Sequence, residues 1–449
     1  MIKIPQAKPT DYKNVEKVIN SLKTNDELMD YFHSFIASYK MLDNKFSFTE
    51  SFDEEFIFEQ LKKILLMRDH SLFAIPFGVK DVFNTKTLPT TMGSNVWRGF
   101  MAGNNARVVD EITDRGGLVF SKTTTAEFAV HYIQAGETLN PHNSLHITGT
   151  SSAGSAVAVA CGALPICLGT QTAGSIVRPA SFCGVFGFKP SFGAIDRTGV
   201  LKTADTLDTI GLLGSDIYGL QKVFFEIFQK DRNYPNARKY FEHHSSYKEK
   251  RKLKIGIVTD QFLPFEEYKP YVKDSFNQLI KELNNPELLI EKISDIEFIN
   301  EIHSLHDIIY CKSLSYYFQD EHARGSGVSD LMTEMISKGE SISTNAFIDA
   351  SSRQPDFRLH FDTIFKNYDF ILTPSTASAA PLIGETELDD TNLIWTFMGY
   401  PVMSLPIFWS EKLGLPYGLQ IIAPKFGDFS LFDFSQSVLD KFSARMDSN

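Results

Sequence analysis

Apolar residues recur at helical spacing in the first part of the chain and then gather into short continuous runs. Residues 10 to about 68 show the spacing of amphipathic helices, and residues 24–27 carry a helix-start signal. The apolar runs 74–79 and 118–120 are short enough for buried strands, with a helical segment at 108–115 between them. This alternation predicts an α/β fold with a large mixed, mostly parallel central sheet covered by helices on both faces.

The rest of the chain continues this alternation and then changes in texture. Residues 155–161 carry small side chains suited to a helix packed closely on a sheet, and 165–168 follow as a strand. The polar stretch 231–254 predicts a solvated connection, after which residues 265–365 are mostly helical. Further strands are expected at 255–258, 370–374, 402–406 and 418–422. The later strands are expected to return to the first sheet.

Charge and apolar content disfavour two classes of partner. The chain has 44 Lys and Arg against 55 Asp and Glu, a formal net charge of −11, so no nucleic-acid partner is expected. The longest apolar run, 153–168, contains glycine, serine and proline and falls short of the roughly 18 apolar residues of a membrane span.

The N-terminus lacks the apolar core of a secretory signal, and the four cysteines match no metal or redox spacing. We therefore expect a cytoplasmic protein with free thiols.

The segment 149–188 carries a single charge, Arg178. Two turns rich in glycine, serine and threonine, 149–155 and 169–175, flank its apolar middle. Hydroxyl groups and backbone N–H groups held in short loops between buried elements are what acyl-transfer chemistry requires. This segment is the first candidate for a functional site.

Other chemistries do not fit the same residues. The turn 169–175 has glycines but lacks the lysine of a phosphate-binding loop, and Thr150 stands where a nucleophile elbow at Ser152 would need glycine. His142 and His146 are four residues apart, but the neighbouring proline and asparagine indicate a loop. No metal and no cofactor are therefore expected. No serine is obviously tied to a histidine, so another base is required.

Lys80 is the candidate base, at the end of the apolar run 72–79. With a reference pKa of about 10.4, only about one lysine in 2,500 is neutral at pH 7. Burial at the end of a strand removes much of this handicap, because desolvation disfavours the ammonium form. A carboxylate facing Lys80 would oppose the effect, but the neighbouring Asp81 is expected on the opposite face of the strand.

Three segments together resemble the amidase signature family. IPFGVKD at residues 75–81 resembles the family's lysine motif, GTSSAGS at 149–155 its GGSSGGS stretch, and LGTQTAGSI at 168–176 its GTDTGGSI element. The spacing between Ser151 and Ser175 is that of the family's bridging and nucleophilic serines. Segments that agree in addition are 88–94, 122–128, 140–141, 183–190, 399–401 and 414–420. The resemblance is strong over 72–215, weaker over 368–428 and indistinct between.

The resemblance implies a Ser-cisSer-Lys triad. Ser175 would attack an amide carbonyl, Ser151 would relay the proton after a cis Thr150–Ser151 bond, and neutral Lys80 would accept it. The developing oxyanion would be held by the backbone N–H groups of Thr172, Ala173 and Gly174. Ser152 and Gln171 are expected to support these loops, Ser152 by orienting its loop or by capping the next helix.

The second turn departs from the family pattern at three positions. Gln171 replaces an aspartate, and Val177 replaces the arginine found two residues after the nucleophile. We interpret this as the replacement of a structural ion pair by neutral packing, because the loss of one partner alone would leave a buried charge. Ala173 replaces a glycine, which requires a negative φ at this residue.

The predicted function is hydrolysis of a linear carboxamide to a carboxylate and ammonia or an amine. The alternatives are the glutaminase component of a tRNA-dependent amidotransferase (its A subunit), which works with partner subunits, and a catalytically silent scaffold. We expect a small amide as substrate, no membrane association, and leave a homodimer open. Residues 1–449 are expected to form a single domain, divided into an N-terminal helical segment (1–70), a catalytic core (72–215), a variable, mostly helical region (230–365) and C-terminal strands (368–430).

Overall fold

One mixed sheet carries strands from most of the length of the chain. The structure is a computed structural model that describes residues 2–3, 10–130, 137–229, 237–248, 252–260, 262–283, 286–294, 296–324 and 327–446. Within these ranges, the sheet has the strand order β1-β3-β2-β4-β6-β5-β10-β11-β9-β7-β8. The strands are β1 (Thr49–Ser51), β2 (Pro76–Lys80), β3 (Leu118–Thr123), β4 (Ile166–Gln171), β5 (Phe186–Lys189), β6 (Thr209–Gly214), β7 (Leu253–Ile257), β8 (Leu288–Lys292), β9 (Phe370–Pro374), β10 (Val402–Ser410) and β11 (Leu415–Ile422).

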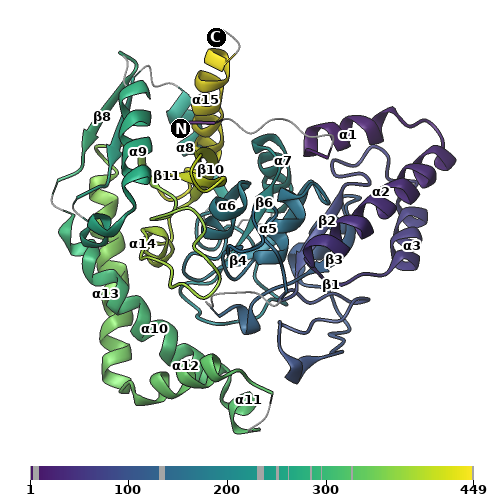
Figure 1. The fold of residues 1–449 in the computed structure, drawn as a ribbon, viewed down its shortest axis with the longest axis horizontal. Helices are drawn as coiled ribbons and strands as arrows, with labels where there is room; N and C mark the ends of the chain where they lie inside the picture. The colour runs from purple at the N-terminus through teal and green to yellow at the C-terminus, as the bar shows by residue number, and fades with distance from the viewer. Residues whose placement is uncertain are drawn as a thin grey trace.

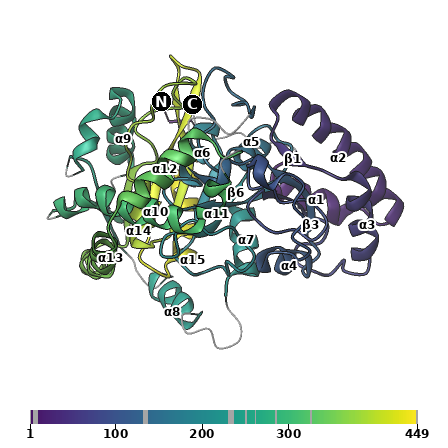
Figure 2. The ribbon, with the colours of Figure 1, turned by 90° about the horizontal axis from the view of Figure 1, so that it is seen from below.

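Helices flank this sheet. They are α1 (Tyr12–Ser21), α2 (Asn25–Phe46), α3 (Glu54–Ile64), α4 (Arg107–Thr113), α5 (Ala153–Ala160), α6 (Val177–Cys183), α7 (Ile217–Ile227), α8 (Ala237–Lys248), α9 (Pro270–Leu283), α10 (Ile302–Tyr317), α11 (Gln319–Ala323), α12 (Asp330–Ser341), α13 (Thr344–Ile364), α14 (Asn392–Met398) and α15 (Asp428–Met446). Helices α1–α3 lie beside β1–β3, while α9 and α13 lie at the opposite end of the molecule (Figure 1; Figure 2). None of the helices described is both long enough and apolar enough to cross a bilayer.

The α/β class is confirmed, but the expected predominance of parallel strands is wrong. Parallel pairings join β3, β2 and β4 on one side and β9, β7 and β8 on the other. All other neighbours in the order are antiparallel. The reason lies in the connections: the short turn 411–414 joins β10 to β11, and no helix lies between β5 and β6. Strands joined without a crossover helix pair in antiparallel fashion.

Most of the expected elements are present. The helix-start signal at 24–27 is a capping box, in which the Glu27 N–H donates to the Thr24 hydroxyl and the Glu27 carboxylate accepts from the Thr24 N–H. The expected polar connection at 231–254 lies partly outside the described residues, and its described part contains α8. The four strands that were not predicted are β1, β5, β6 and β8.

The parallel pairing of β2 with β4 is what places the site. Val79 of β2 is in register with Leu168 of β4, and both strands are buried along their whole length. The carboxyl ends of parallel strands meet at one edge of a sheet. Lys80, the last residue of β2, therefore lies at the same edge as the loop that follows Gln171.

Candidate active site

Lys80 is buried and bonded to two hydroxyl groups. Its side chain has no exposed surface, and its Nζ lies 2.7 Å from Ser151 Oγ and 2.8 Å from Thr170 Oγ1. Burial lowers the pKa of Lys80 well below its usual value, an effect that the Asp208 carboxylate opposes. Lys80 thus combines a base's geometry with the environment that favours its neutral form.

Asp81 faces away from Lys80, as the strand geometry predicts. Its carboxylate pairs with Lys122 at 2.7 Å, and neither side chain of the pair is exposed. The second carboxylate oxygen accepts from the Thr91 N–H at 2.8 Å and from its hydroxyl at 2.5 Å. The negative charge next to Lys80 in sequence is therefore neutralised on the other face of β2.

We expect Lys122→Met to destabilise the fold. The change leaves the buried Asp81 carboxylate without its cation, and breaking a buried pair from one side costs about 3–5 kcal/mol. Urea unfolding of the variant measures this loss. The double variant Lys122→Met/Asp81→Asn, which removes both charges, is the control and should lose less. A loss below about 1 kcal/mol in the single variant would contradict the role given to the pair.

The loop that carries Ser151 packs directly on the helix after Ser175. The Thr150–Ser151 peptide bond is cis, as the resemblance implied. Gly149 has a φ of 79°, and a Cβ on it would lie 2.9 Å from the Pro179 Cα of α6, so only glycine fits there. Ser152 orients this loop: its Oγ lies 3.2 Å from the Thr170 carbonyl oxygen. Its side chain does not cap α5.

Ser175 is the member of the three that solvent reaches. It is 6% exposed, whereas Lys80 and Ser151 are fully buried. The hydrogen bonds of the described residues include none between Ser151 and Ser175. The structure thus brings Lys80 and Ser151 into contact and leaves Ser175 with a small accessible surface.

Gln171 holds the start of α6 with neutral hydrogen bonds. Its Oε1 accepts from the N–H groups of Ile176 at 2.7 Å and Val177 at 3.0 Å. Its Nε2 donates to Thr396 Oγ1 at 2.8 Å. Val177, which stands in place of the family's arginine, is fully buried. The environment of Gln171 is therefore the neutral packing that the sequence suggested.

Arg178 supplies a buried ion pair from a neighbouring position. Its Nε lies 3.0 Å from a Glu387 oxygen and 3.1 Å from a carboxylate oxygen of Asp390. Burial raises the pKa of Glu387 to about 7, although Arg178 acts in the opposite direction. A Cβ on Gly174 would lie 3.0 Å from the Arg178 guanidinium carbon, so this cation packs against the loop before Ser175.

The N–H groups of Thr172, Ala173 and Gly174 have no acceptor among the hydrogen bonds of the described residues. Thr172 and Gly174 are buried and Ala173 is half-buried, and buried N–H groups in native structures nearly always have a partner. Ala173 is not among the residues with positive φ, so the requirement that its replacement of glycine imposed is met.

Four residues around this loop were not found from the sequence. Thr170 accepts from Lys80, and the Asp208 carboxylate accepts from the Thr172 hydroxyl at 2.7 Å. His306 of α10 donates from Nε2 to the Thr172 carbonyl at 2.9 Å, and Thr396 of α14 donates to the Ala173 carbonyl at 2.7 Å. Burial lowers the pKa of His306 to about 4, so its ring is neutral at pH 7.

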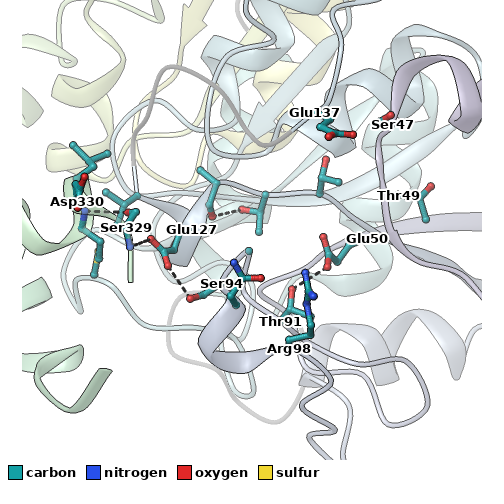
Figure 3. A pocket seen from close by; sticks show the side chains of 18 residues that line it. Ser47, Thr49, Glu50, Thr91, Ser94, Arg98, Glu127, Glu137, Ser329 and Asp330 are labelled. Atoms are coloured by element: carbon teal, nitrogen blue, oxygen red, sulfur yellow. Dashed lines mark hydrogen bonds between the residues drawn. The ribbon is translucent and has the colours of Figure 1, made fainter. Parts of the chain in front are cut away.

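A cavity of about 820 Å³ is lined by many polar side chains (Figure 3). Its wall includes Ala126, whose N–H donates to the Ser151 carbonyl at 3.4 Å. Lys80, Ser151 and Ser175 do not line it. The carboxylates that do line it are those of Glu50, Glu127, Glu137 and Asp330. The cavity therefore adjoins the site without opening onto Ser175.

The histidine pair of the sequence serves local structure. His142 Nε2 lies 2.9 Å from the Cys183 carbonyl oxygen, and His146 Nδ1 lies 2.6 Å from that of Ala380. Each ring therefore engages a different backbone carbonyl, which fits the loop interpretation.

Comparison with known proteins gives the family and the fold of this chain. A sequence model of the amidase family matches residues 32–432. The A subunit of the Halothermothrix orenii glutamyl-tRNA(Gln) amidotransferase is 28% identical over 408 residues, which cover 82% of this chain and 85% of that protein. The solved peptide amidase of Stenotrophomonas maltophilia has a TM-score of 0.79 at 21% identity, covering 96% of each chain. A further solved amidase has a TM-score of 0.80 at 23% identity, covering 97% of this chain and 99% of that one.

The chain is an enzyme that acts on carbon–nitrogen bonds. The chain belongs to the amidase family, since the match covers nearly the whole of it.

Proposed function

We propose that this enzyme hydrolyses a linear carboxamide through an acyl-enzyme on Ser175. The observation that carries the proposal is the fully buried Lys80, whose Nζ lies 2.7 Å from Ser151 Oγ at the sheet edge where Ser175 keeps a small accessible surface. A lysine with a lowered pKa is a base, a serine hydroxyl can both accept and donate a proton, and an accessible serine can attack. The three groups would thus supply the base, the proton relay and the nucleophile that a serine hydrolase needs.

In the proposed reaction, Ser175 Oγ attacks the amide carbonyl carbon while its proton passes to Ser151 Oγ. Ser151 gives its own proton to neutral Lys80, which becomes an ammonium. When the tetrahedral intermediate collapses, the carbon–nitrogen bond breaks, and the leaving nitrogen takes a proton back through Ser151. Water then attacks the acyl-enzyme by the same proton path, which yields the carboxylate and frees Ser175.

The oxyanion of each tetrahedral intermediate would be held by the N–H groups of Thr172, Ala173 and Gly174. Because Thr172 and Gly174 are buried and the three N–H groups have no other acceptor among the described residues, their hydrogen bonds would be strong and would need little reorganisation. Ser152 and Gln171 support this arrangement by holding the two loops in place.

Two further elements belong to the proposal. We treat residues 1–449 as a single domain, because strands from Thr49 to Ile422 share one sheet. We place the protein in the cytoplasm, where its four free cysteines, three of them buried, would stay reduced.

A second candidate function is that of a glutaminase working inside an amidotransferase complex. It is favoured by the 28% identity to proteins that are named for work on glutamyl-tRNA(Gln). The same Lys80, Ser151 and Ser175 would then release ammonia from glutamine for use by a partner protein.

The purified chain alone is expected to hydrolyse at least one member of a panel of linear amides that includes glutamine and ureas. A fluorophosphonate probe is expected to label Ser175, because the probe reports an activated serine. Release of ammonia or amine and mass spectrometry of the labelled peptide are the measurements.

The outcomes separate the candidates. Turnover of simple amides by the lone chain supports the hydrolase, whereas glutamine turnover that depends on added partner proteins favours the amidotransferase component. An intact protein that the probe never labels at Ser175 contradicts both enzyme assignments and leaves the silent scaffold.

A further inference from the structure

Two side chains from helices distant in sequence donate hydrogen bonds to the loop 172–174, which precedes Ser175. The His306 Nε2–H donates to the Thr172 carbonyl at 2.9 Å, from 134 positions along the chain. The Thr396 hydroxyl donates to the Ala173 carbonyl at 2.7 Å, from 223 positions away. Both acceptors belong to the loop whose N–H groups have no acceptor among the described hydrogen bonds.

Each of the two carbonyls that accept these hydrogen bonds shares a peptide unit with one of the loop's N–H groups. A trans peptide unit is planar, and its C=O and N–H bonds point in opposite directions. The Thr172 carbonyl is therefore paired with the Ala173 N–H, and the Ala173 carbonyl with the Gly174 N–H. Fixing the carbonyl from one side fixes the direction in which the N–H points on the other.

The direction of the Thr396 hydrogen bond is set by Gln171. Gln171 Oε1 must face the N–H groups of Ile176 and Val177, because these can only donate, so its Nε2 faces Thr396 at 2.8 Å. The Thr396 oxygen then accepts from Gln171, and its single proton is left for a carbonyl. Ala173 O at 2.7 Å is nearer than Asn392 O at 3.1 Å.

The family's aspartate could not fulfil this role at position 171. A carboxylate can only accept hydrogen bonds, so it would draw the Thr396 proton to itself and away from the loop. The departure from the family pattern at Gln171 thus acquires a function in this chain, because the amide donates where a carboxylate would accept.

We propose that His306 and Thr396 are positioning residues that aim the Ala173 and Gly174 N–H groups at the oxyanion of the substrate. This inference rests on the proposed function, since it assigns the oxyanion loop its supports. Neither side chain touches the reacting atoms. Both act through the backbone carbonyls that they hold.

Thr396→Val removes the hydroxyl at nearly constant volume and is expected to lower kcat about 10- to 100-fold, below the roughly 10²- to 10³-fold effect of losing an oxyanion donor outright. KM should change by less than about 3-fold, because the donors act mainly in the transition state. The pH profile of kcat/KM should keep its shape, since the proton path through Lys80 is untouched. Thr396→Ser, which keeps the hydroxyl, should recover most of the rate.

Two more variants test the same hydrogen bonds to the loop carbonyls. Gln171→Glu keeps the shape of the side chain but reverses the hydrogen bond to Thr396, and it should lower kcat in the same way. His306→Phe keeps a ring without the donor and should also lower kcat. Thr391→Val is the matched control, because Thr391 is a buried threonine beside α14 whose hydroxyl bonds Gln420 instead of the loop. It should leave kcat unchanged.

The rate of Ser175 labelling by the fluorophosphonate probe is measured beside amide turnover, because the phosphoryl oxygen would use the same N–H groups. Slower labelling in Thr396→Val with recovery in Thr396→Ser supports the inference. Equal labelling rates and equal kcat in wild type, Thr396→Val and His306→Phe overturn it, as does a Thr396→Ser variant as slow as Thr396→Val. A wild-type protein that is labelled at Ser175 but hydrolyses no amide contradicts the hydrolase proposal alone.

Discussion

Ser175→Ala is expected to abolish amide turnover while leaving the fold intact. The proposed reaction forms a bond between Ser175 Oγ and the acyl carbon, and alanine has no atom that can form it. Loss of the nucleophile in a serine hydrolase costs on the order of 10⁶-fold in kcat. Ser175 is only 6% exposed and makes no hydrogen bond with Ser151 in this structure, so its removal should change stability little.

The measurement is initial-rate hydrolysis of the best amide found in the panel, with unfolding temperatures recorded in parallel. Ser181→Ala is a matched control: this buried serine lies on α6, where its hydroxyl contacts Thr376 and the Gly418 N–H. The control should lose stability and retain turnover. A Ser175→Ala variant that keeps more than about 1% of the wild-type rate would refute its role as nucleophile.

The local structure around the three candidate residues could be predicted from short segments of sequence. Lys80 lies at the end of a short apolar strand, and Ser151 and Ser175 lie in turns that follow or precede buried elements. Because each of these placements depends on a few neighbouring residues, a short sequence motif is enough to predict it. The cis bond before Ser151 was implied by the family resemblance, and the opposite facing of Asp81 follows from the alternation of side chains along a strand.

The residues that contact the site from other parts of the chain could not be predicted from local sequence. His306 and Thr396 contact the backbone of residues 172–173 from helices that are far away in sequence, and their neighbours carry no pattern that distinguishes them from ordinary helix residues. Asp208 contacts Thr172 from the position just before β6, a strand that was itself missed. Such contacts arise from the packing of α10, α14 and the sheet, which periodicity does not specify.

The prediction that most strands are parallel was wrong for a related reason. Apolar runs alternating with helices favour parallel crossovers, and this holds for β3, β2 and β4. The short strands β5 and β6 are joined by residues 190–208, which contain no helix, and they pair antiparallel. The prediction was therefore correct for the pairing of β2 with β3 and β4, and wrong from the pairing of β4 with β6 onward through the middle of the sheet.

Lys80→Met is expected to remove the base and lower kcat/KM by about 10²- to 10⁴-fold, the usual contribution of a positioned proton acceptor. Methionine fills a similar volume and carries no proton acceptor strong enough to serve Ser151. In the wild type, kcat/KM should fall as the pH is lowered, because protonation of Lys80 removes the neutral amine. The variant's residual rate should lack this dependence on Lys80, and a variant that retains the wild-type pH profile would refute the assignment.

The same substitution also tests whether Lys80 is neutral in the folded protein. Burial lowers the pKa of Lys80 when folded, whereas in the unfolded chain it is about 10.4, so below that pH the unfolded state binds a proton that the folded state does not. The wild type therefore loses about 1.4 kcal/mol of unfolding free energy for each pH unit of descent from about 10.4 to the folded pKa, and the methionine variant does not. Urea unfolding of both proteins between about pH 7 and 9.5 should show the variant's relative stability shrinking as the pH rises. A difference that stays constant over this range would mean that Lys80 is charged in the folded state, and the proton path from Ser175 through Ser151 would then have no acceptor.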